Sequence, residues 1–440
     1  MKILVVGSGA REHGMVKALQ RSPQEKTIYC YGTTLNPGIA QLSKHYVAGD
    51  LADTSAIIEK AKAWGIELAI IGPELPLERG LADELWQIDI PTIGPKKTLA
   101  QIETSKNFAR DLMKKYQIAG LPRYQTFNSL ERVDAYLHEL GEGNYVIKAN
   151  GLMAGKGVKV AGEHLFSFAE AKLFCNKILS KKQTFIIEEK LIGQEFSFMC
   201  FADGKTLIPM PLVQDHKRAN NGDLGPNTGG MGSYSDSNHS LPFLTGEEHE
   251  QAFTINQAVF KALSEECKEP YIGILYGGFI ATREGIYVIE FNARFGDPEA
   301  LNILSLLESD FLALCQSMIT GKLDKNKVKF SNQATVCKYA VPLGYPDKPM
   351  KNFVVDFSRV SDQSNLYLAS VHKTDHMLVA AGSRTAAYVG IADTLAEAEQ
   401  KAEIQISMID GFLFHREDIG TEKLIQHRIN QMMRLRKPCA

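Results

Sequence analysis

A short apolar strand, a glycine-rich turn and a helix open the chain, and this order constrains the fold more than any other feature. Residues Lys2–Val6 have the pattern of a buried strand, Gly7–Gly14 form the turn, and Met15–Gln20 continue as a helix. Backbone N–H groups at the start of such a helix are free and converge, which makes an anion site. The sequence therefore predicts a Rossmann-like first unit in an α/β fold.

The dinucleotide-binding fingerprint is incomplete in this unit. Glu12 occupies the position where the third glycine would stand. The next predicted strand, Thr27–Tyr31, ends at Gly32 without an acidic residue placed to hold a ribose. We therefore do not expect NAD as a ligand.

The alternation of strands and helices continues beyond this unit. Thr54–Trp64 is predicted to be a helix and Glu67–Ile71 a strand. Ligands bind at the carboxyl ends of parallel strands, so the loops Thr33–Gly38 and Gly72–Pro76 are candidates for substrate contact. The alternative is that the glycine and proline of the second loop only end a strand.

A glycine-rich hairpin follows near residue 150. The predicted strand Tyr145–Lys148 ends on a lysine, and the loop Asn150–Val158 leads into a second strand that ends at Ala161. Glycines let the backbone approach phosphates, and Lys148 and Lys156 supply positive charge. The loop lacks the spacing of a P-loop. The alternative is an ordinary hairpin with solvated lysines, but Lys148 ends an apolar strand directly before the glycines, which favours function.

Polar residues follow an apolar strand near residue 290. Ile286–Ile289 are apolar, and Glu290 and Asn292 come next, two positions apart. Side chains of a strand alternate between faces, so these two share a face, and Arg294 follows on it. Carboxylate and amide oxygens suit Mg²⁺ that is shared with phosphate, and a guanidinium suits an anion. The alternative is an edge strand whose polar residues only face water.

Between these two features lies a dense polar cluster. The strand predicted at Thr184–Glu189 runs on to Glu195, and Gln214–Arg218 is polar although it is wedged between apolar strands. It precedes the glycine-rich loop Asn227–Gly232, which has too many glycines for a role in packing alone. We expect His216 to make a structural hydrogen bond and not to act as a base or ligand.

The last hundred residues give no catalytic constellation. Strands are predicted at Thr335–Val341, Tyr367–His372 and Ala386–Ile391, with a helix at Leu395–Met408. The basic tail that runs from His427 is expected to be a solvated helix end and not a nucleic-acid surface.

The composition agrees with a multidomain protein of a reducing compartment. The chain has 440 residues, which suffices for about three domains, and its net charge of −2 gives no basis for a nucleic-acid partner. Its seven cysteines are scattered without a C-x-x-C pair, which argues against a disulfide framework and a zinc site. The chain starts without a leader pattern and has no apolar run of bilayer length, so we expect a cytoplasmic protein without membrane contact.

Taken in order, these features resemble the ATP-grasp superfamily and, within it, the phosphoribosylamine–glycine ligase family. The resemblance is strong to about residue 320 and weaker beyond. The motifs that carry it are Gly7–His13, Gly72–Glu74, Ile147–Gly151, Ala154–Val158, Gln214–Arg218, Gly225–Gly232 and Glu290–Glu299.

The resemblance implies an architecture and a reaction. A Rossmann-like N-terminal domain would span residues 1–105, and an ATP-grasp domain 106–330 would carry a mobile lid subdomain at about 125–192. A small α+β C-terminal domain would span 331–440. The reaction would join glycine to 5-phosphoribosylamine through a glycyl phosphate, and give glycinamide ribonucleotide, ADP and phosphate in purine synthesis. The family suggests a monomer or weak homodimer with small-molecule substrates and no nucleic-acid or membrane partner.

The resemblance also implies roles for the nucleotide side. Lys106 and Lys148 would contact the ATP phosphates, and the loop Gly151–Val158 would close over them. The junction Glu188–Leu191 would meet the adenine through backbone groups, and Glu195 would meet the ribose. The implied ATP-binding set is Lys106, Lys148, Gly151, Gly155, Lys156, Gly157, Glu188, Glu189, Leu191 and Glu195.

The remaining roles fall on the metal and acceptor sides. Glu290 and Asn292 would bind Mg²⁺ or Mn²⁺. The implied substrate-binding set is Gly9, Arg11, Glu12, Glu74, Asp215, Lys217, Arg294, Gly296 and Asp297. The implied catalytic residues are Lys148, Asp215, Arg294 and Asp297.

Three segments depart from the family pattern. Asn36–Ile39 resembles archaeal members more than bacterial ones, Thr104–Lys106 replaces a Gly-Ser-Lys, and Gly382–Arg384 replaces a Gly-Gly-Arg. These departures concern contacts to the amine substrate and not nucleotide binding. Two alternatives stay open at this point: an ATP-grasp ligase for another amine or acid, and a non-catalytic nucleotide-binding regulator. The presence of Lys148, Glu290 and Asn292 together argues against the regulator.

Overall fold

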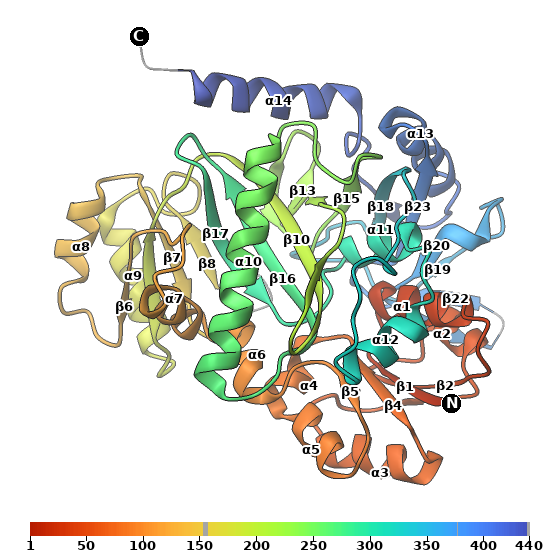
Figure 1. Cartoon of the computed structure of the whole chain (residues 1–440). Helices are drawn as coiled ribbons and strands as arrows, with labels where there is room; N and C mark the ends of the chain where they lie inside the picture. The colour runs from red at the N-terminus through yellow and green to blue at the C-terminus, as the bar shows by residue number, and fades with distance from the viewer. Residues whose placement is uncertain (153–156, 376, 438–440) are drawn as a thin grey trace.

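The computed structural model describes residues 1–152, 157–375 and 377–437, and Figure 1 shows its arrangement. The first unit is a parallel sheet in the order β3-β2-β1-β4-β5. Its strands are β1 (Lys2–Val6), β2 (Thr27–Gly32), β3 (His45–Ala48), β4 (Leu68–Ile71) and β5 (Thr92–Ile93). The strand order reverses between β1 and β4, and their carboxyl ends therefore open a crevice for ligands. The predicted Rossmann-like unit is confirmed.

Helices connect and cover these strands. The first one starts earlier than predicted, at Ala10, because Gly9 is its N-cap and the Glu12 carboxylate folds back onto the Gly9 N–H. The helices of this unit are α1 (Ala10–Gln20), α2 (Pro37–Leu42), α3 (Thr54–Trp64), α4 (Glu74–Arg79), α5 (Leu81–Gln87) and α6 (Lys97–Thr104).

A lid subdomain with a hydrophobic core of its own follows, on the left of Figure 1. Its antiparallel sheet has the order β6-β9-β7-β8. The elements are β6 (Tyr124–Phe127), α8 (Val133–Leu140), β7 (Tyr145–Ala149), β8 (Val158–Val160), α9 (Phe168–Leu179) and β9 (Phe185–Glu189). The predicted hairpin is confirmed, with Lys148 opposite Val158. The strand predicted to run on to Glu195 is wrong, because the chain leaves this sheet after Glu189.

The central sheet has the order β11-β10-β16-β17 and lies behind the long helix α10 in Figure 1. Its strands are β10 (Gln194–Asp203), β11 (Leu207–Pro209), β16 (Ile272–Ala281) and β17 (Ile286–Asn292). The helices nearby are α7 (Lys106–Lys115), α10 (Gly246–Cys267), α11 (Glu299–Leu306) and α12 (Phe311–Ile319). β17 is the predicted Glu-x-Asn strand, and it is an edge strand of this sheet.

The C-terminal sheet recruits two strands from the middle of the chain. Its order is β12-β15-β18-β23-β20, and β24 also pairs with β18. The strands are β12 (Gln214–Asp215), β15 (Gly232–Ser235), β18 (Ala334–Pro342), β20 (Leu366–Leu368), β23 (Ala386–Ala392) and β24 (Leu413–Phe414). The polar cluster at Gln214–Arg218 is therefore attached to the C-terminal domain, which the sequence did not reveal.

Smaller elements complete the C-terminal half. They are the hairpin β13 (Arg218–Asn220) and β14 (Leu224–Asn227), the sheet of β19 (Phe353–Val355), β21 (Val371–Thr374) and β22 (Met377–Ala380), the 3₁₀ turn Gln363–Asn365, α13 (Leu395–Ile406) and α14 (Glu422–Arg436). The strand predicted at Tyr367–His372 is wrong as one element, because β20 and β21 belong to different sheets. Within the described ranges, no helix is long and apolar enough to cross a membrane.

Candidate active site

The site is centred on Glu290, near the end of β17. This strand has a bulge at Ile289, directly before Glu290. The Ile289 carbonyl oxygen turns outward there and accepts hydrogen bonds from Lys148 at 3.0 Å and from Arg110 at 2.8 Å. Glu290 and Asn292 are both half-buried, as expected for side chains that share one face of the strand.

Several cations act on the charge of the Glu290 carboxylate. Burial disfavours its charge, but nearby cations outweigh this effect and lower the pKa of Glu290. The cations are Lys217, Lys106, Lys148 and Arg294, in order of their effect. The structure thus brings together lysines predicted for the nucleotide phosphates and cations predicted for the acceptor substrate.

Lys148 is held by a buried carboxylate at the end of β9. Its Nζ lies 2.6 Å from Glu188, which also pairs with Arg110 at 2.6 Å. Burial raises the pKa of Glu188, but the two cations outweigh it and lower this pKa to about 2. Burial lowers the pKa of Lys148, against the effect of Glu188, and the nearby Arg110 lowers it further. The Glu188 side chain therefore orients Lys148, and only its backbone is free to face a nucleotide base.

Lys106 reaches the glycine loop from the start of α7. Ser105 is the N-cap of this helix, and Lys106 Nζ donates to the Gly151 carbonyl oxygen at 3.0 Å. The Gly157 carbonyl oxygen accepts from the Ala149 N–H at 2.8 Å and closes the hairpin. The predicted contacts Gly155 and Lys156 lie outside the described residues.

The predicted adenine junction lies between the lid sheet and the central sheet. Glu189 pairs with Arg123 at 2.9 Å near the surface, so its side chain is directed away from the site. Leu191 is half-buried in the crossing segment. Glu195 stands at the start of β10 and lies 3.6 Å from Lys217. This arrangement leaves backbone groups of the junction, rather than carboxylates, for a base.

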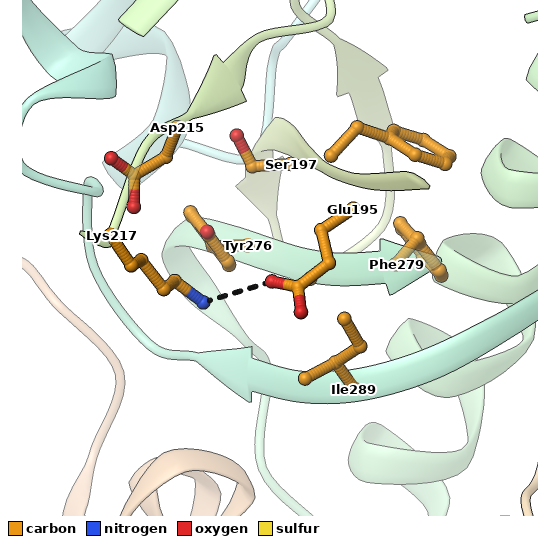
Figure 2. A pocket seen from close by; sticks show the side chains of 9 residues that line it. Glu195, Ser197, Asp215, Lys217, Tyr276, Phe279 and Ile289 are labelled. Carbon is orange, nitrogen blue, oxygen red and sulfur yellow. Dashed lines mark ion pairs between the residues drawn. The ribbon is translucent and has the colours of Figure 1, made fainter. Parts of the chain in front are cut away.

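Figure 2 shows the pocket into which Glu195 and Lys217 point, and the ion pair between them. Lys217 Nζ also lies 3.7 Å from Glu290. Burial disfavours the charge of Lys217, but these carboxylates and the nearby Asp215 outweigh it and raise the pKa of Lys217. Lys217 therefore stays an ammonium and links the predicted ribose side to the predicted metal side.

Asp215 lines the same pocket and is incompletely paired. Its Oδ1 atom is buried and has no hydrogen-bond partner among the described residues. Burial and the neighbouring Glu299 raise the pKa of Asp215 well above its usual range. Tyr276 lines the pocket as well, and it donates to Glu299 at 2.9 Å. An unpartnered carboxyl oxygen beside an ammonium is suited to receive a hydrogen bond from an amine substrate.

Arg294 lies between two acids of the N-terminal half. Its guanidinium lies 2.8 Å from Glu103 and 3.4 Å from Glu74. Burial opposes its charge, but the two carboxylates outweigh this and raise the pKa of Arg294. Burial raises the pKa of Glu103, against the effect of Arg294. The fork of Arg294 is thus fixed in place before any anion arrives.

Asp297 is held by the C-terminal domain. Tyr339 on β18 donates to its carboxylate at 2.6 Å, and Arg384 pairs with its other oxygen at 3.0 Å. Arg384 also donates to the Asp297 carbonyl oxygen at 2.9 Å and to the Gly229 carbonyl oxygen at 2.7 Å. The last hundred residues, in which we found no catalytic constellation, thus contribute Tyr339 and Arg384 as supports of Asp297.

The first glycine turn packs against this region. A Cβ atom on Gly9 would lie 3.7 Å from the Asp297 carboxylate, and Arg11 donates to the Phe295 carbonyl oxygen at 3.1 Å. Both Glu12 oxygens are engaged, by the Gly9 N–H at 2.6 Å and by Arg11 at 2.7 Å. The Glu12 carboxylate thus holds the glycine turn by these two contacts and is not directed out of the protein. Gly296 packs closely against Glu299. A Cβ atom at position 296 would lie 2.4 Å from the Glu299 carboxylate.

His216 does not make the structural hydrogen bond that the sequence predicted. Neither of its ring nitrogens has a hydrogen-bond partner within the described part of the chain. The side chain points away from Asp215 and Lys217, toward the Tyr234 ring at 5.9 Å. Burial and the nearby Arg428 lower the pKa of His216 to about 3, so the imidazole is neutral.

The donor set near β17 fits a divalent cation shared with phosphate. Glu290 supplies a carboxylate and Asn292 an amide on one face, and lysines that could hold phosphates lie beside them. Among the described residues, no group of three or more His, Cys, Asp or Glu side chains could hold a metal ion by itself. A carboxylate and an amide oxygen leave coordination positions for the waters and phosphate oxygens that Mg²⁺ keeps.

Sequence reasoning missed several residues that support this site. Glu103 and Arg110 are buried charges whose partners are far away in the chain, and Tyr339 comes from the C-terminal domain. The one available signal was a charged residue on the apolar face of a predicted helix, as with Glu103 and Arg110 in α6 and α7.

The fold and the site together define an ATP-grasp enzyme: a lid hairpin that ends on a lysine, and a Glu-x-Asn strand that faces it. The chain matches the N domain of phosphoribosylglycinamide synthetase at residues 1–103, the ATP-grasp (A) domain at 104–300 and the C domain at 335–422. It belongs to the phosphoribosylamine–glycine ligase family, as the motifs of the sequence indicated.

Relatives support this assignment over the full length. The chain is 46% identical over 436 residues to the phosphoribosylamine–glycine ligase of Methanosarcina barkeri, covering 99% of this chain and all of that one. It is 46% identical over 444 residues to the ligase of Methanococcus vannielii, again covering 99% and 100% of the two chains.

Solved structures agree with the fold. The crystal structure of the phosphoribosylamine–glycine ligase of Thermotoga maritima has a TM-score of 0.79 and 26% identity, covering 95% of this chain and all of that one. The ADP complex of an N5-carboxyaminoimidazole ribonucleotide synthetase has a TM-score of 0.64, with 92% and 96% covered. Its identity is 16%, so it shows a shared fold alone.

Proposed function

We propose that this chain joins glycine to 5-phosphoribosylamine with ATP and yields glycinamide ribonucleotide, ADP and phosphate, as a step of purine synthesis. The observation that carries the proposal is the position of Glu290. Lys217 Nζ lies 3.7 Å from its carboxylate, and Lys106, Lys148 and Arg294 are near enough to act on its charge as well. One carboxylate thus lies between a site for phosphates and a site for a carboxylate substrate, which is where a phosphoryl group would be transferred.

The chemistry follows from the weakness of a carboxylate as an acyl donor. A glycine carboxylate oxygen attacks the γ-phosphorus of ATP, ADP leaves, and glycyl phosphate forms. The amine of phosphoribosylamine then attacks the glycyl carbonyl carbon, loses a proton, and phosphate leaves. Both steps need positioning and neutralisation of charge more than a covalent protein nucleophile.

The nucleotide side is assigned to the lid and the central domain. Lys148, oriented by Glu188, and Lys106 neutralise the phosphates. Glu290 and Asn292 would hold Mg²⁺ or Mn²⁺, which when bound neutralises charge on the transferring phosphoryl group. Closure of the glycine loop would keep water from the acyl phosphate.

The acceptor side is assigned to residues from all three domains. Arg294, held by two acids, binds the glycine carboxylate by its fork of donors. Asp215 accepts a hydrogen bond from an amine, and Asp297 orients the second amine near the glycine turn at Gly9. The support is geometric: these side chains converge on the loop that follows β17.

We infer further that the chain works in the cytoplasm, as a monomer or weak homodimer. We also propose domain boundaries near residues 105 and 330 and a lid at about 125–192, and the separate hydrophobic core of the lid supports the last of these. These inferences rest on composition and on the family, and sedimentation analysis of the purified chain tests the oligomeric state.

The reaction is tested by one coupled assay. ADP release is measured with glycine, with and without phosphoribosylamine that is generated in the cuvette. Steady ADP release that needs both substrates supports the proposal. ADP release that needs glycine but responds only to another amine would indicate a different ligase. Nucleotide binding without any ADP release would indicate a regulator.

A further inference from the structure

The end of α6 holds a carboxylate that contacts three consecutive residues at the end of the metal-side strand. Glu103 is 8% exposed and is the penultimate residue of α6. One of its oxygens accepts from the Ala293 N–H at 2.7 Å. The other lies 2.8 Å from the Arg294 guanidinium. The third contact is to the side-chain amide of Asn292.

The orientation of the Asn292 amide follows from hydrogen bonding. If its oxygen faced Glu103, two acceptors would oppose each other. With Nδ2 on that side, the amide donates to Glu103 at 3.1 Å and to the Phe291 carbonyl oxygen at 3.2 Å. Amide ends are assigned from such networks, and this orientation satisfies both acceptors. The oxygen Oδ1 is then the end directed away from Glu103.

We propose that Glu103 is a positioning residue that presents Oδ1 of Asn292 to the divalent cation. This inference rests on the proposed function for the assignment of Asn292 as a metal ligand. An amide has one end that can bind a cation and one that cannot, so a fixed carboxylate behind the NH₂ group selects the useful end. Partners of metal ligands typically change metal affinity by about 10–100-fold when they are lost.

Glu74 provides a matched control, because it pairs with the same arginine. Its one side-chain ion pair among the described residues is with Arg294, at 3.4 Å. Glu74→Gln removes a negative charge from Arg294, as Glu103→Gln does. Only Glu103→Gln frees the Asn292 amide to turn, since a glutamine can present either end to it. A general loss of charge near Arg294 would affect both variants alike.

The experiment measures Mn²⁺ binding in the presence of a non-hydrolysable ATP analogue, by electron paramagnetic resonance and without glycine or amine. We expect Glu103→Gln to weaken Mn²⁺ binding by about 10–100-fold and Glu74→Gln to change it by less than about threefold. Equal affinities of the wild type and Glu103→Gln, or equal losses in both variants, would overturn the proposal. Turnover is not needed, so a different substrate specificity would leave this result intact.

A rescue separates orientation from general support of the fold. Asn292→Asp replaces the amide by a carboxylate, whose two oxygens are equivalent and need no selection. When this substitution is already present, the Glu103 carboxylate opposes the new one, so adding Glu103→Gln should not weaken Mn²⁺ binding, which makes the two substitutions strongly non-additive. An undiminished loss in the double variant, relative to Asn292→Asp alone, would overturn the proposal.

The wild-type chain supplies a measurement that needs no variant to fold. A crystal structure with Mn²⁺ and the ATP analogue should place the ion against the end of the Asn292 amide that is remote from Glu103, at roughly 2.1 Å. An ion on the end nearer to Glu103, or no contact between the ion and Asn292, would refute the assignment.

Discussion

Replacing Glu188 by glutamine removes the carboxylate that holds Lys148 and Arg110 together. The side chain is 3% exposed, and each cation lies 2.6 Å from it. Its pKa falls from 4.5 to about 2 on folding, which corresponds to roughly 3 kcal/mol of stability at neutral pH. Breaking a buried ion pair by removing one partner costs a similar amount, roughly 3–5 kcal/mol, because a buried charge is left uncompensated.

The sign of the pH dependence follows from the lowered pKa. A carboxyl group with a depressed pKa contributes its full stability above its unfolded value of 4.5, and this stability is lost as the pH falls toward about 2. Glu188→Gln should therefore lower the free energy of unfolding by roughly 3 kcal/mol at pH 7. The difference from the wild type should shrink as the pH falls below about 4.5.

The assay is urea unfolding followed by circular dichroism over a range of pH, with Glu189→Gln as the control. Glu189 is the next residue, and its ion pair with Arg123 lies near the surface, so its loss should cost less than about 1 kcal/mol. An ATP analogue should restore part of the stability of Glu188→Gln, because the triphosphate is a new anionic partner for Lys148. A Glu188→Gln variant as stable as the control at pH 7 would refute the reasoning.

Three further predictions concern turnover and the lid. Glu290→Gln keeps the size of the side chain but removes the central negative charge, and turnover at saturating substrates should fall by roughly a hundredfold or more. Turnover measured over a Mg²⁺ titration, together with a thermal melt of each variant, checks this prediction. Tyr339→Phe removes the hydrogen bond to Asp297 and should raise the KM of the amine substrate by about tenfold while nucleotide binding stays unchanged; a change confined to the ATP affinity would argue against the assignment. Glu163 on the lid pairs with Arg218 of the β13–β14 hairpin, and Glu163→Gln should increase protease cleavage of the lid, with unchanged cleavage as the contrary result.

Local features of the site could be predicted because they depend on neighbours in the chain. The hairpin that carries Lys148 followed from two apolar strands around a glycine-rich loop. Glu290 and Asn292 were placed on one face by the alternation of a strand, which the bulge at Ile289 leaves intact, since it precedes both residues. The start of α1 at Ala10 was missed because its cap is a glycine rather than a serine or aspartate.

Long-range pairings could not be predicted. Glu103 contacts Ala293 and Arg110 contacts Glu188, and nothing in a single sequence distinguishes such buried charges from solvated ones. The ion pair between Arg384 and Asp297 could not be predicted either. The two residues are 87 positions apart in the chain, and a contact over such a separation leaves no mark in periodicity.

The two halves of the site are built from different parts of the molecule, and this division has a physical consequence. The phosphate side is made by the lid and the central sheet, with Lys148 and Glu290 as its main charges. The acceptor side that we propose draws on distant parts of the chain, because Asp297 lies near the glycine turn at Gly9 and pairs with Arg384. A shared nucleotide half with a separately built acceptor half allows one fold to serve different acceptors. Changes in the first or last domain should therefore alter which amine is accepted, while changes in the lid should alter turnover with every acceptor.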